Sequence, residues 1–299
     1  MDVISYQGWE TCYRLSNGVV ELVVTGEVGP RVIRFGFVED VNEFWEAPAL
    51  LGKSGGDAWV NYGGHRLWHA PEAEPRTYAP DNEPVKVEEH EGFVRFIQPV
   101  EASTGIEKAL DIRLDAGTAR VEVIHRLRNT NLWTVRLAPW ALSVMAPGGT
   151  AVVPLPPRGP HPENLAPTGR LALWAYTDMR DPRWTWGTRF ILLRQDPQTA
   201  TPQKVGVFVP DGWAAYARAG HLFVKTFEVV EEASYPDLGV NVETFTNAEM
   251  LELETLAPLV DLAPGTEATY VERWHLFDGV PAPTSDEDVA AQILPLLEL

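Results

Sequence analysis

Alternating apolar and polar residues recur from one end of the chain to the other. The clearest of these segments are residues 18–25, 31–37, 86–98, 108–127, 135–145, 189–195, 203–209, 221–230, 241–256 and 268–276. Successive side chains of a β-strand point to opposite faces, so this period predicts half-buried strands. Twenty-five prolines and twenty-four glycines punctuate the segments, which is typical of strands joined by turns. We therefore expect an all-β protein.

The C-terminus is the exception to this alternation. Ser285 is a good helix N-cap, the acidic residues 286–288 suit the first turn, and Pro295 should bend or end the helix early. The proline-rich residues 154–167 predict a long surface loop, with strand signals continuing on both sides. We expect residues 1–299 to form a single domain, a large antiparallel β-sandwich of two wide sheets with a short C-terminal helix.

The charge balance restricts the partners of the chain. With 24 basic and 42 acidic residues the net charge is -18, a field that repels phosphate backbones and anionic membrane surfaces. We therefore expect neither nucleic acid nor a membrane as partner. The single cysteine, Cys12, cannot form an intramolecular disulfide. The first residues lack the basic start and apolar run of a secretory signal, so we expect a cytoplasmic protein.

Residues 106–127 predict a hairpin that turns at residues 116–117. With that turn, Lys108 faces His125 on the apolar side of the sheet. Two cations placed opposite each other repel, so either His125 is neutral or an acid from another strand lies nearby. A functional histidine and a hydrogen-bonded core histidine are both consistent with this position.

Residues 241–254 predict a second hairpin, turning at residues 247–248 if the loop has two residues. Glu243 then faces Glu252, and Glu254 shares the same face of the sheet. Crowded carboxylates raise one another's pKa, which suits a general base or a cation site. The alternative is a solvent-facing surface, the usual place for charge on a sheet. A three-residue loop would break up the cluster.

Residues 63–72, with the sequence GGHRLWHAPE, crowd two histidines, an arginine and a tryptophan behind a glycine pair. His65 and His69 have a spacing that lets a helix present both to one metal ion. The glycine pair and Pro71 favour a loop or strand instead, and no HExxH or CxxC motif supports zinc. We therefore expect no metal.

The motifs of nucleotide cofactors and of one common nucleophile are missing from the sequence. It has no GxGxxG or Walker motif and no G-x-S-x-G elbow, so we expect no cofactor. Eleven tryptophans and eight tyrosines are left to explain. Aromatic faces pack well against the C–H side of a sugar ring, but large aromatics also fill large cores. The sequence is consistent with both uses.

The order of these features resembles the galactose mutarotase-like superfamily, which includes aldose 1-epimerases and hexose-6-phosphate mutarotases. Residues 26–37 (GEVGPRVIRFGF) look like its early glycine-rich strand pair, and residues 63–72 stand where it has a substrate-gripping loop. The LET run at 253–255 matches the epimerase run whose glutamate is the general base, although Leu256 replaces a glutamine. The resemblance implies a large sandwich that binds a small-molecule carbohydrate, with Glu254 as base.

One departure concerns the general acid. The epimerases carry a histidine in a central strand, whereas the corresponding residues 137–142 contain none and offer Trp140. Mutarotation needs a base for the anomeric hydroxyl and an acid for the ring oxygen. We expect the acid to be a histidine from elsewhere, with His65 and His125 as the first candidates and His69 as the third.

The leading hypothesis is a carbohydrate-binding protein that is either an aldose epimerase or mutarotase acting by acid–base chemistry, or a binding module without turnover. An accessory domain of a polysaccharide-degrading system ranks last. In each case the ligand is a sugar or sugar acid. The residues expected to hold it are Arg31, Arg66, Trp68, His69, Lys108, Trp140, Glu243 and Glu252.

Overall fold

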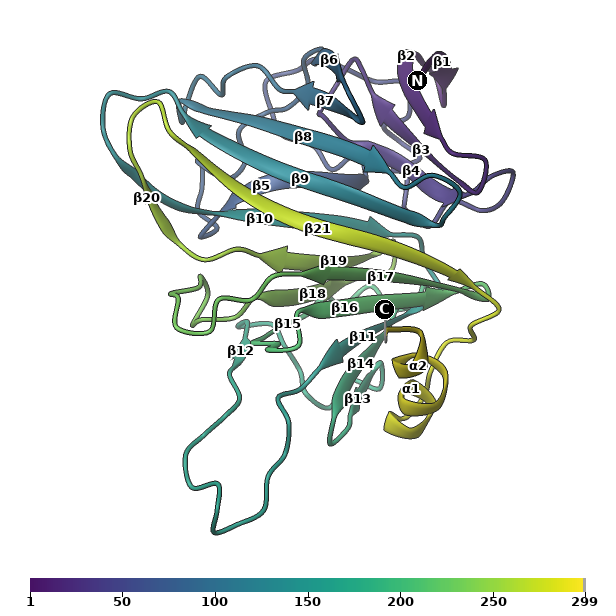
Figure 1. Ribbon diagram of the computed structural model, residues 1–299, viewed down its shortest axis with the longest axis vertical. Coiled ribbons are helices and arrows are strands. Elements are labelled where there is room, and N and C mark those ends of the chain that lie inside the picture. The colour runs from purple at the N-terminus through teal and green to yellow at the C-terminus, as the bar shows by residue number, and fades with distance from the viewer. Residues whose placement is uncertain (298–299) are drawn as a thin grey trace.

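Two antiparallel sheets dominate the computed structural model, which describes residues 1–297 (Figure 1). The first has eleven strands, in spatial order β1 (Asp2–Tyr6), β2 (Trp9–Ser16), β3 (Val20–Thr25), β4 (Val32–Phe37), β5 (Gly64–Ala70), β10 (Val135–Met145), β19 (Leu251–Leu256), β18 (Val242–Thr246), β15 (Gln203–Val207) and β12 (Leu171–Leu173), with β20 (Val260–Leu262) beside β10.

The second sheet has ten strands. Their spatial order is β13 (Trp184–Trp186), β14 (Phe190–Arg194), β11 (Thr150–Pro154), β16 (Trp213–Arg218), β17 (His221–Phe227), β21 (Glu267–Asp278), β9 (Arg120–Asn129), β8 (Ile106–Leu114), β7 (Phe93–Ile97) and β6 (Lys86–His90). All ten alternating segments of the sequence fall on strands of these two sheets.

The main hydrophobic core lies between the two sheets. Phe35 and Leu67 of the first sheet join Ile112, Phe223 and Trp274 of the second in one buried cluster. Burying a side chain of this size contributes about 1.5–3 kcal/mol, so the inward half of each alternating strand holds the sheets together. The predicted all-β antiparallel sandwich is confirmed.

A short C-terminal helix packs on the outer face of the second sheet. Helix α1 (Asp286–Gln292) begins after Ser285, whose hydroxyl accepts from the Asp288 amide at 3.2 Å, and α2 (Leu294–Leu297) follows directly. Val289 is buried with residues of β11, β14 and β16. The predicted cap and the early end before Pro295 are confirmed. Neither helix within residues 1–297 has the length and apolarity to cross a membrane.

The proline-rich segment forms the predicted long loop. Strand β11 ends at Pro154 and β12 starts at Leu171, and the chain between them extends away from both sheets (Figure 1). The strands on either side of this loop belong to different sheets.

The register of the 106–127 hairpin differs from the prediction by two residues. Leu110, not Lys108, lies opposite His125, because the loop spans 116–119 and the Asp115 amide donates to the Arg120 carbonyl at 3.1 Å. A shift of two residues leaves every side chain on its predicted face. The expected opposition of Lys108 and His125 is therefore wrong, although both point to the core.

The second hairpin shows the same shift for a local reason. Glu243 lies opposite Glu254, not Glu252. The Asn247 side chain accepts from the amides of Glu249 and Met250, at 2.8 and 3.2 Å. This side-chain turn moves the two-residue loop from 247–248 to 248–249, where the Asn247 amide donates to the Met250 carbonyl at 3.2 Å. The three glutamates still share one face of the sheet, as the alternation predicts.

Residues 64–70 form β5, a strand between β4 and β10 near the middle of the first sheet. The loop expected from the resemblance is therefore wrong, and the strand alternative is correct. Gly63 and Gly64 have φ of 92° and 69°. A Cβ on Gly64 would come within 2.5 Å of the Val32 carbonyl oxygen, so glycine is needed for β5 to approach β4. As part of a strand, the side chains of this run alternate between the two faces of the sheet.

Candidate functional site

A pocket of about 250 Å³ opens on the face of the first sheet that points away from the core. It is lined by Trp59, Asn61, Arg66, Trp68, Glu72, Tyr78, Trp140, Leu142, Tyr176, Lys204, Phe245, Met250 and Glu252. A larger hollow of about 360 Å³ lies between residues 79–83 and 98–103, but no aromatic side chain lines it. Only the smaller pocket combines several aromatic rings with charged groups.

Aromatic rings form one wall of the pocket. Trp68 lies with its ring centroid 4.8 Å from Trp59, 5.2 Å from Tyr78 and 5.3 Å from Trp140. Trp68 and Trp140 are opposite each other in β5 and β10, and Trp59 precedes β5 in the chain. These planar surfaces suit the C–H face of a sugar ring, while the Trp59 indole N–H has no partner among residues 1–297.

Arg66 brings hydrogen-bond donors to the same wall. Its Nη2 donates to Glu252 Oε1 at 2.9 Å, and the guanidinium carbon lies 4.5 Å from the Trp68 ring centroid. Nε and Nη1 are buried and find no acceptor within the described part of the chain. A buried donor without a partner costs about 1–3 kcal/mol, so a ligand that accepts from Arg66 recovers this cost.

Lys204 joins two glutamates beside the pocket. Its Nζ lies 2.8 Å from Glu243 Oε2 and 3.2 Å from Glu254 Oε2. Glu254 Oε2 also accepts from Trp140 Nε1 at 2.9 Å. Lys204 and Trp140 line the pocket, whereas Glu243 and Glu254 lie beneath its lining, fully buried. The ammonium group is also 4.7 Å from the centre of the Trp174 ring.

Burial and charge set the protonation of this cluster. Burial alone would lower the pKa of Lys204, but Glu243 and Glu254 raise it well above its ordinary value. Burial raises the pKa of Glu243 well above normal and that of Glu254 less strongly, against the opposing effect of Lys204. Both carboxyl groups therefore resist ionisation more than a free glutamate does, and the lysine between them keeps its charge.

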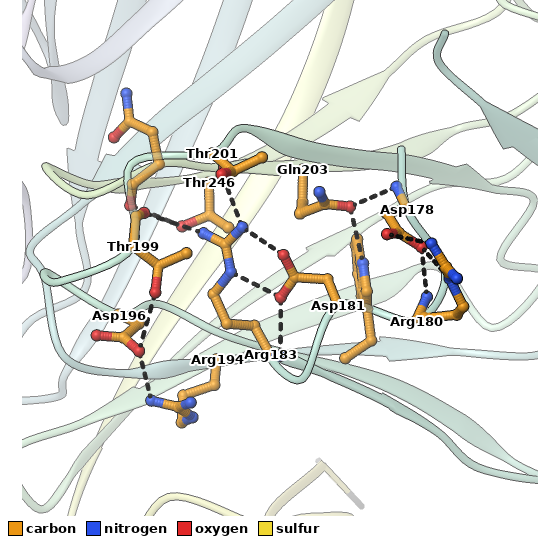
Figure 2. Close-up of polar contacts among 12 residues, drawn as sticks. Asp178, Arg180, Asp181, Arg183, Arg194, Asp196, Thr199, Thr201, Gln203 and Thr246 are labelled. Atoms are coloured by element: carbon orange, nitrogen blue, oxygen red, sulfur yellow. Dashed lines mark hydrogen bonds and ion pairs between the residues drawn. The ribbon is translucent and has the colours of Figure 1, made fainter. Parts of the chain in front are cut away.

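A hydrogen-bonded segment next to the sheet fixes the start of β15 and so positions Lys204. Figure 2 shows Gln203, whose side-chain oxygen accepts from the Asp178 amide at 2.9 Å. In the same network Arg183 Nη2 donates to the Thr201 carbonyl at 2.6 Å. Because Gln203 is anchored on the core side, Lys204 must point to the pocket side.

His65 and His125 lie on the opposite face from the pocket, between the two sheets. The Tyr270 carbonyl can only accept, so His125 Nδ1 donates to it at 3.0 Å. In the neutral ring His125 Nε2 then accepts from His65 Nε2 at 2.7 Å, and His65 Nδ1 accepts from the Ser143 hydroxyl at 2.9 Å. Burial lowers the pKa of both histidines. The structure does not bring them together with Glu254.

The same interior cluster contains one more possible metal ligand. Glu272 and the two histidines bring ligand atoms within 4.8 Å of one another. However, Glu272 already pairs with Lys225 Nζ at 2.7 Å and accepts from Trp274 Nε1 at 2.8 Å. The histidine nitrogens are hydrogen-bonded as well. The ligand atoms of this cluster therefore already have partners within the protein.

His69 and Lys108 also face the core, where both bind Glu101. His69 Nε2 lies 3.2 Å from a Glu101 oxygen, and Lys108 forms an ion pair with the other oxygen. Burial opposes ionisation of Glu101, but Lys108 and His69 outweigh it and lower the Glu101 pKa to about 2. Neither residue lines the pocket. A nearby acid was one of the two alternatives for the buried cations, and Glu101 lies beside Lys108, although in the loop between β7 and β8 and not on another strand.

Arg31 supports the pocket from outside its lining. It pairs with Asp81 at 2.8 Å and donates to the carbonyls of Val60 and Gly63 at 3.2 and 3.4 Å. The two carbonyl contacts hold the segment that carries Trp59 to the start of β5, and Asp81 lies in the chain that follows β5. Nη1 and Nη2 of Arg31 therefore donate to groups of the protein, and only Nε has no acceptor within residues 1–297.

Of the residues expected to bind sugar, Arg66, Trp68, Trp140 and Glu252 line the pocket, and Glu243 and Glu254 lie directly beneath it. Four further residues line the pocket and were not expected from the sequence: Lys204, Trp59, Tyr78 and Tyr176. Alternation in 203–209 signals a strand with Lys204 on one face, but only the strand order reveals which glutamates it meets.

Known proteins resemble this chain in structure. No protein-family model and no curated protein matches the sequence. A galactose mutarotase-like protein from Lactobacillus casei has a similar structure, with a TM-score of 0.56, 11% identity, and coverage of 89% of this chain and 100% of its own. A galactose mutarotase related enzyme from Lactobacillus acidophilus gives 0.54 at 12% identity, covering 92% and 99%.

A third similar structure is part of a longer chain. A TPR-domain containing protein from Parabacteroides distasonis gives a TM-score of 0.59 at 13% identity, and the match covers 96% of this chain and 49% of that one. Likeness at such low identity shows the fold alone. The chain has the galactose mutarotase-like fold, as the sequence resemblance implied.

Proposed function

We propose that this protein binds a small-molecule carbohydrate in the pocket on the first sheet. The observation that carries the proposal is the aromatic wall of Trp59, Trp68 and Trp140 beside the unpartnered donors of Arg66. Aromatic faces and a few placed polar groups are what a sugar needs, because a pyranose has apolar C–H faces and hydroxyls at its edge. The mutarotase-like fold supports the same conclusion.

In its enzymatic form the proposed function is interconversion of sugar anomers. Glu254 takes the proton of the anomeric hydroxyl, the bond from the anomeric carbon to the ring oxygen breaks, and an acid protonates that oxygen. The open-chain aldehyde rotates and the steps reverse. Arg66 and Glu252 hold hydroxyl groups of the sugar while Trp68 packs against the ring.

The test is the rate of anomer interconversion of common hexoses, measured by polarimetry or exchange NMR. We expect Glu254→Gln to lower the rate at least 100-fold, since a positioned acid or base contributes about 10²–10⁴. Glu249→Gln, in the exposed turn of the same hairpin, is the matched control and should leave the rate unchanged. Equal rates for wild type and Glu254→Gln would remove Glu254 as the base.

Sugar binding without turnover is the second candidate, favoured by a specific observation. Residues 137–142 of β10 contain no histidine, and His65 and His125 face the core. In this case calorimetry detects binding and the sugar is recovered with its anomer ratio relaxing at the uncatalysed rate. Trp68→Ala should then weaken binding at least tenfold, about 1.4 kcal/mol.

A further inference from the structure

We propose that Lys204 is the acid of this reaction, donating a proton from Nζ to the ring oxygen of the sugar. The inference rests on the enzymatic form of the proposed function and names the residue that takes the place of the missing strand histidine. It is carried by the position of Lys204, which lines the pocket and contacts both Glu243 and Glu254.

The two histidines favoured from the sequence do not fill this role in the observed arrangement. They lie on the core side of the first sheet, and every one of their four ring nitrogens is engaged by another group. A general acid must come within hydrogen-bond reach of the oxygen that it protonates. For His65 and His125, the first sheet itself separates the rings from the pocket.

Among the cationic side chains that line the pocket, Lys204 is the one able to release a proton, and it does so as Glu254, whose negative charge raises the pKa of the lysine, is neutralised by the hydroxyl proton. The other cationic side chain is Arg66, whose guanidinium stays protonated in proteins. A lysine ammonium has three donors, and Nζ of Lys204 directs two contacts to the glutamates beneath the lining. A third N–H is left, and Lys204 is among the residues that line the pocket.

The third N–H lies close to the base that the reaction needs. Glu254 Oε2 is 3.2 Å from Nζ, and Trp140 Nε1 holds the same carboxylate at 2.9 Å. Mutarotation requires the acid and the base near one carbon and its two oxygens. Lys204 and Glu254 are in contact on one sheet face, so a sugar that binds Nζ of Lys204 is close to the carboxyl group of Glu254.

The proton balance closes within the cluster. Glu254 gains the hydroxyl proton, Nζ of Lys204 gives one to the ring oxygen, and the ring bond breaks. The two transfers leave a neutral amine on Lys204 and a protonated carboxyl on Glu254, whose Oε2 is 3.2 Å from Nζ. Ring closure on the other face of the aldehyde reverses each transfer, so the cluster ends with the protons it began with and needs no further reactant.

The decisive variants are Lys204→Met and Lys204→Ala, assayed on the full chain for anomer interconversion. We expect Lys204→Met to lower kcat at least 100-fold with KM within about threefold, because the lost group acts on the transition state. Methylammonium added to Lys204→Ala should restore part of kcat, with rates that depend on the pKa of the added amine. Lys86→Met, which removes an exposed lysine paired with Glu88, is the control.

A second variant guards against loss of folding. Lys204→Met leaves two buried carboxyl groups without their cation, which destabilises a protein, so Lys204→Met/Glu243→Gln removes one of them. Thermal unfolding checks that it folds, and its kcat should remain at least 100-fold down. A kcat for Lys204→Met within threefold of wild type would overturn the role of Lys204 alone. A wild type that binds sugar but never speeds interconversion would overturn the enzymatic function and this role together.

Discussion

His65 and His125 are two fully buried histidines held neutral by their surroundings. Burial comes first among the causes that lower their pKa values, and the ring–ring contact of 2.7 Å disfavours a charge on either. A histidine whose pKa is depressed in the folded state binds its proton more readily in the unfolded chain. Its contribution to stability is complete above the unfolded pKa of about 6.5 and is lost as the pH falls below it.

This linkage predicts a pH-dependent effect of His65→Gln. The difference in the free energy of unfolding between wild type and His65→Gln should become smaller as the pH falls from 7 to 5. The expected change is up to about 1.4 kcal/mol per pH unit. The pKa of Glu243 is raised, so this residue makes the free energy of unfolding increase as the pH falls over the same range. Glu243 is present in both proteins, so its effect cancels in the difference between variant and wild type. Urea unfolding at several pH values measures the difference. His161→Gln, in the exposed loop after β11, should show no such trend, and a parallel pH profile for His65→Gln would contradict the neutral pair.

At the scale of elements, alternation predicts faces better than registers. Both hairpins are shifted by two residues relative to prediction, because the first loop has four residues, 116–119, and the second turn lies one residue later than expected, at 248–249. An even shift keeps the faces, so the sequence correctly placed Glu243 with Glu254 and turned His125 to the core. The side-chain turn at Asn247 depends on a local geometry that alternation does not encode. The same reasoning failed for residues 64–70, where the glycine pair indicates a close strand contact as readily as a loop.

One carboxylate adds to the apolar packing of Val289 in holding the C-terminal helix to the second sheet. Asp286 accepts from the amides of Thr188 and Arg189 at 2.7 and 3.0 Å, and from Phe190 at 3.2 Å. Asp286→Ala removes these hydrogen bonds to a charged group, and we expect a loss of about 1–3 kcal/mol in the free energy of unfolding. Urea titration measures it. Glu287→Ala, which removes the exposed neighbouring acid, should cost far less, and equal losses for both would mean that general helix effects dominate.

For the whole molecule, the sequence predicted the sandwich but not the order of its strands. The pocket depends on that order, since β5, β10, β19, β18 and β15 are adjacent in the sheet but dispersed in the chain. Lys204 meets Glu243 and Glu254 only because β15 pairs with β18 and β18 with β19. Such long-range pairings are decided by the packing of the complete core, which a local pattern cannot specify.

The distribution of charge over the molecule predicts which sugars bind. The chain carries a net charge of -18, and the cations of the pocket are matched by acids, Arg66 by Glu252 and Lys204 by Glu243 and Glu254. The local cations are therefore offset, and the overall field should repel an anionic ligand. Salt screens such a field over about 10 Å at 0.1 M.

We therefore expect the affinity for glucose to be unchanged between 10 and 300 mM NaCl, and the affinity for glucuronate to rise several-fold over that range, both measured by calorimetry. Glucose differs from glucuronate mainly by the carboxylate, so it serves as the control for effects of salt on the protein. Replacing Glu252 by glutamine releases Arg66 from its partner, and should favour glucuronate at every salt concentration. Tightest glucuronate binding by the wild type at low salt would instead mean that Arg66 and Lys204 outweigh the field of the whole molecule, and that the natural ligand is a sugar acid.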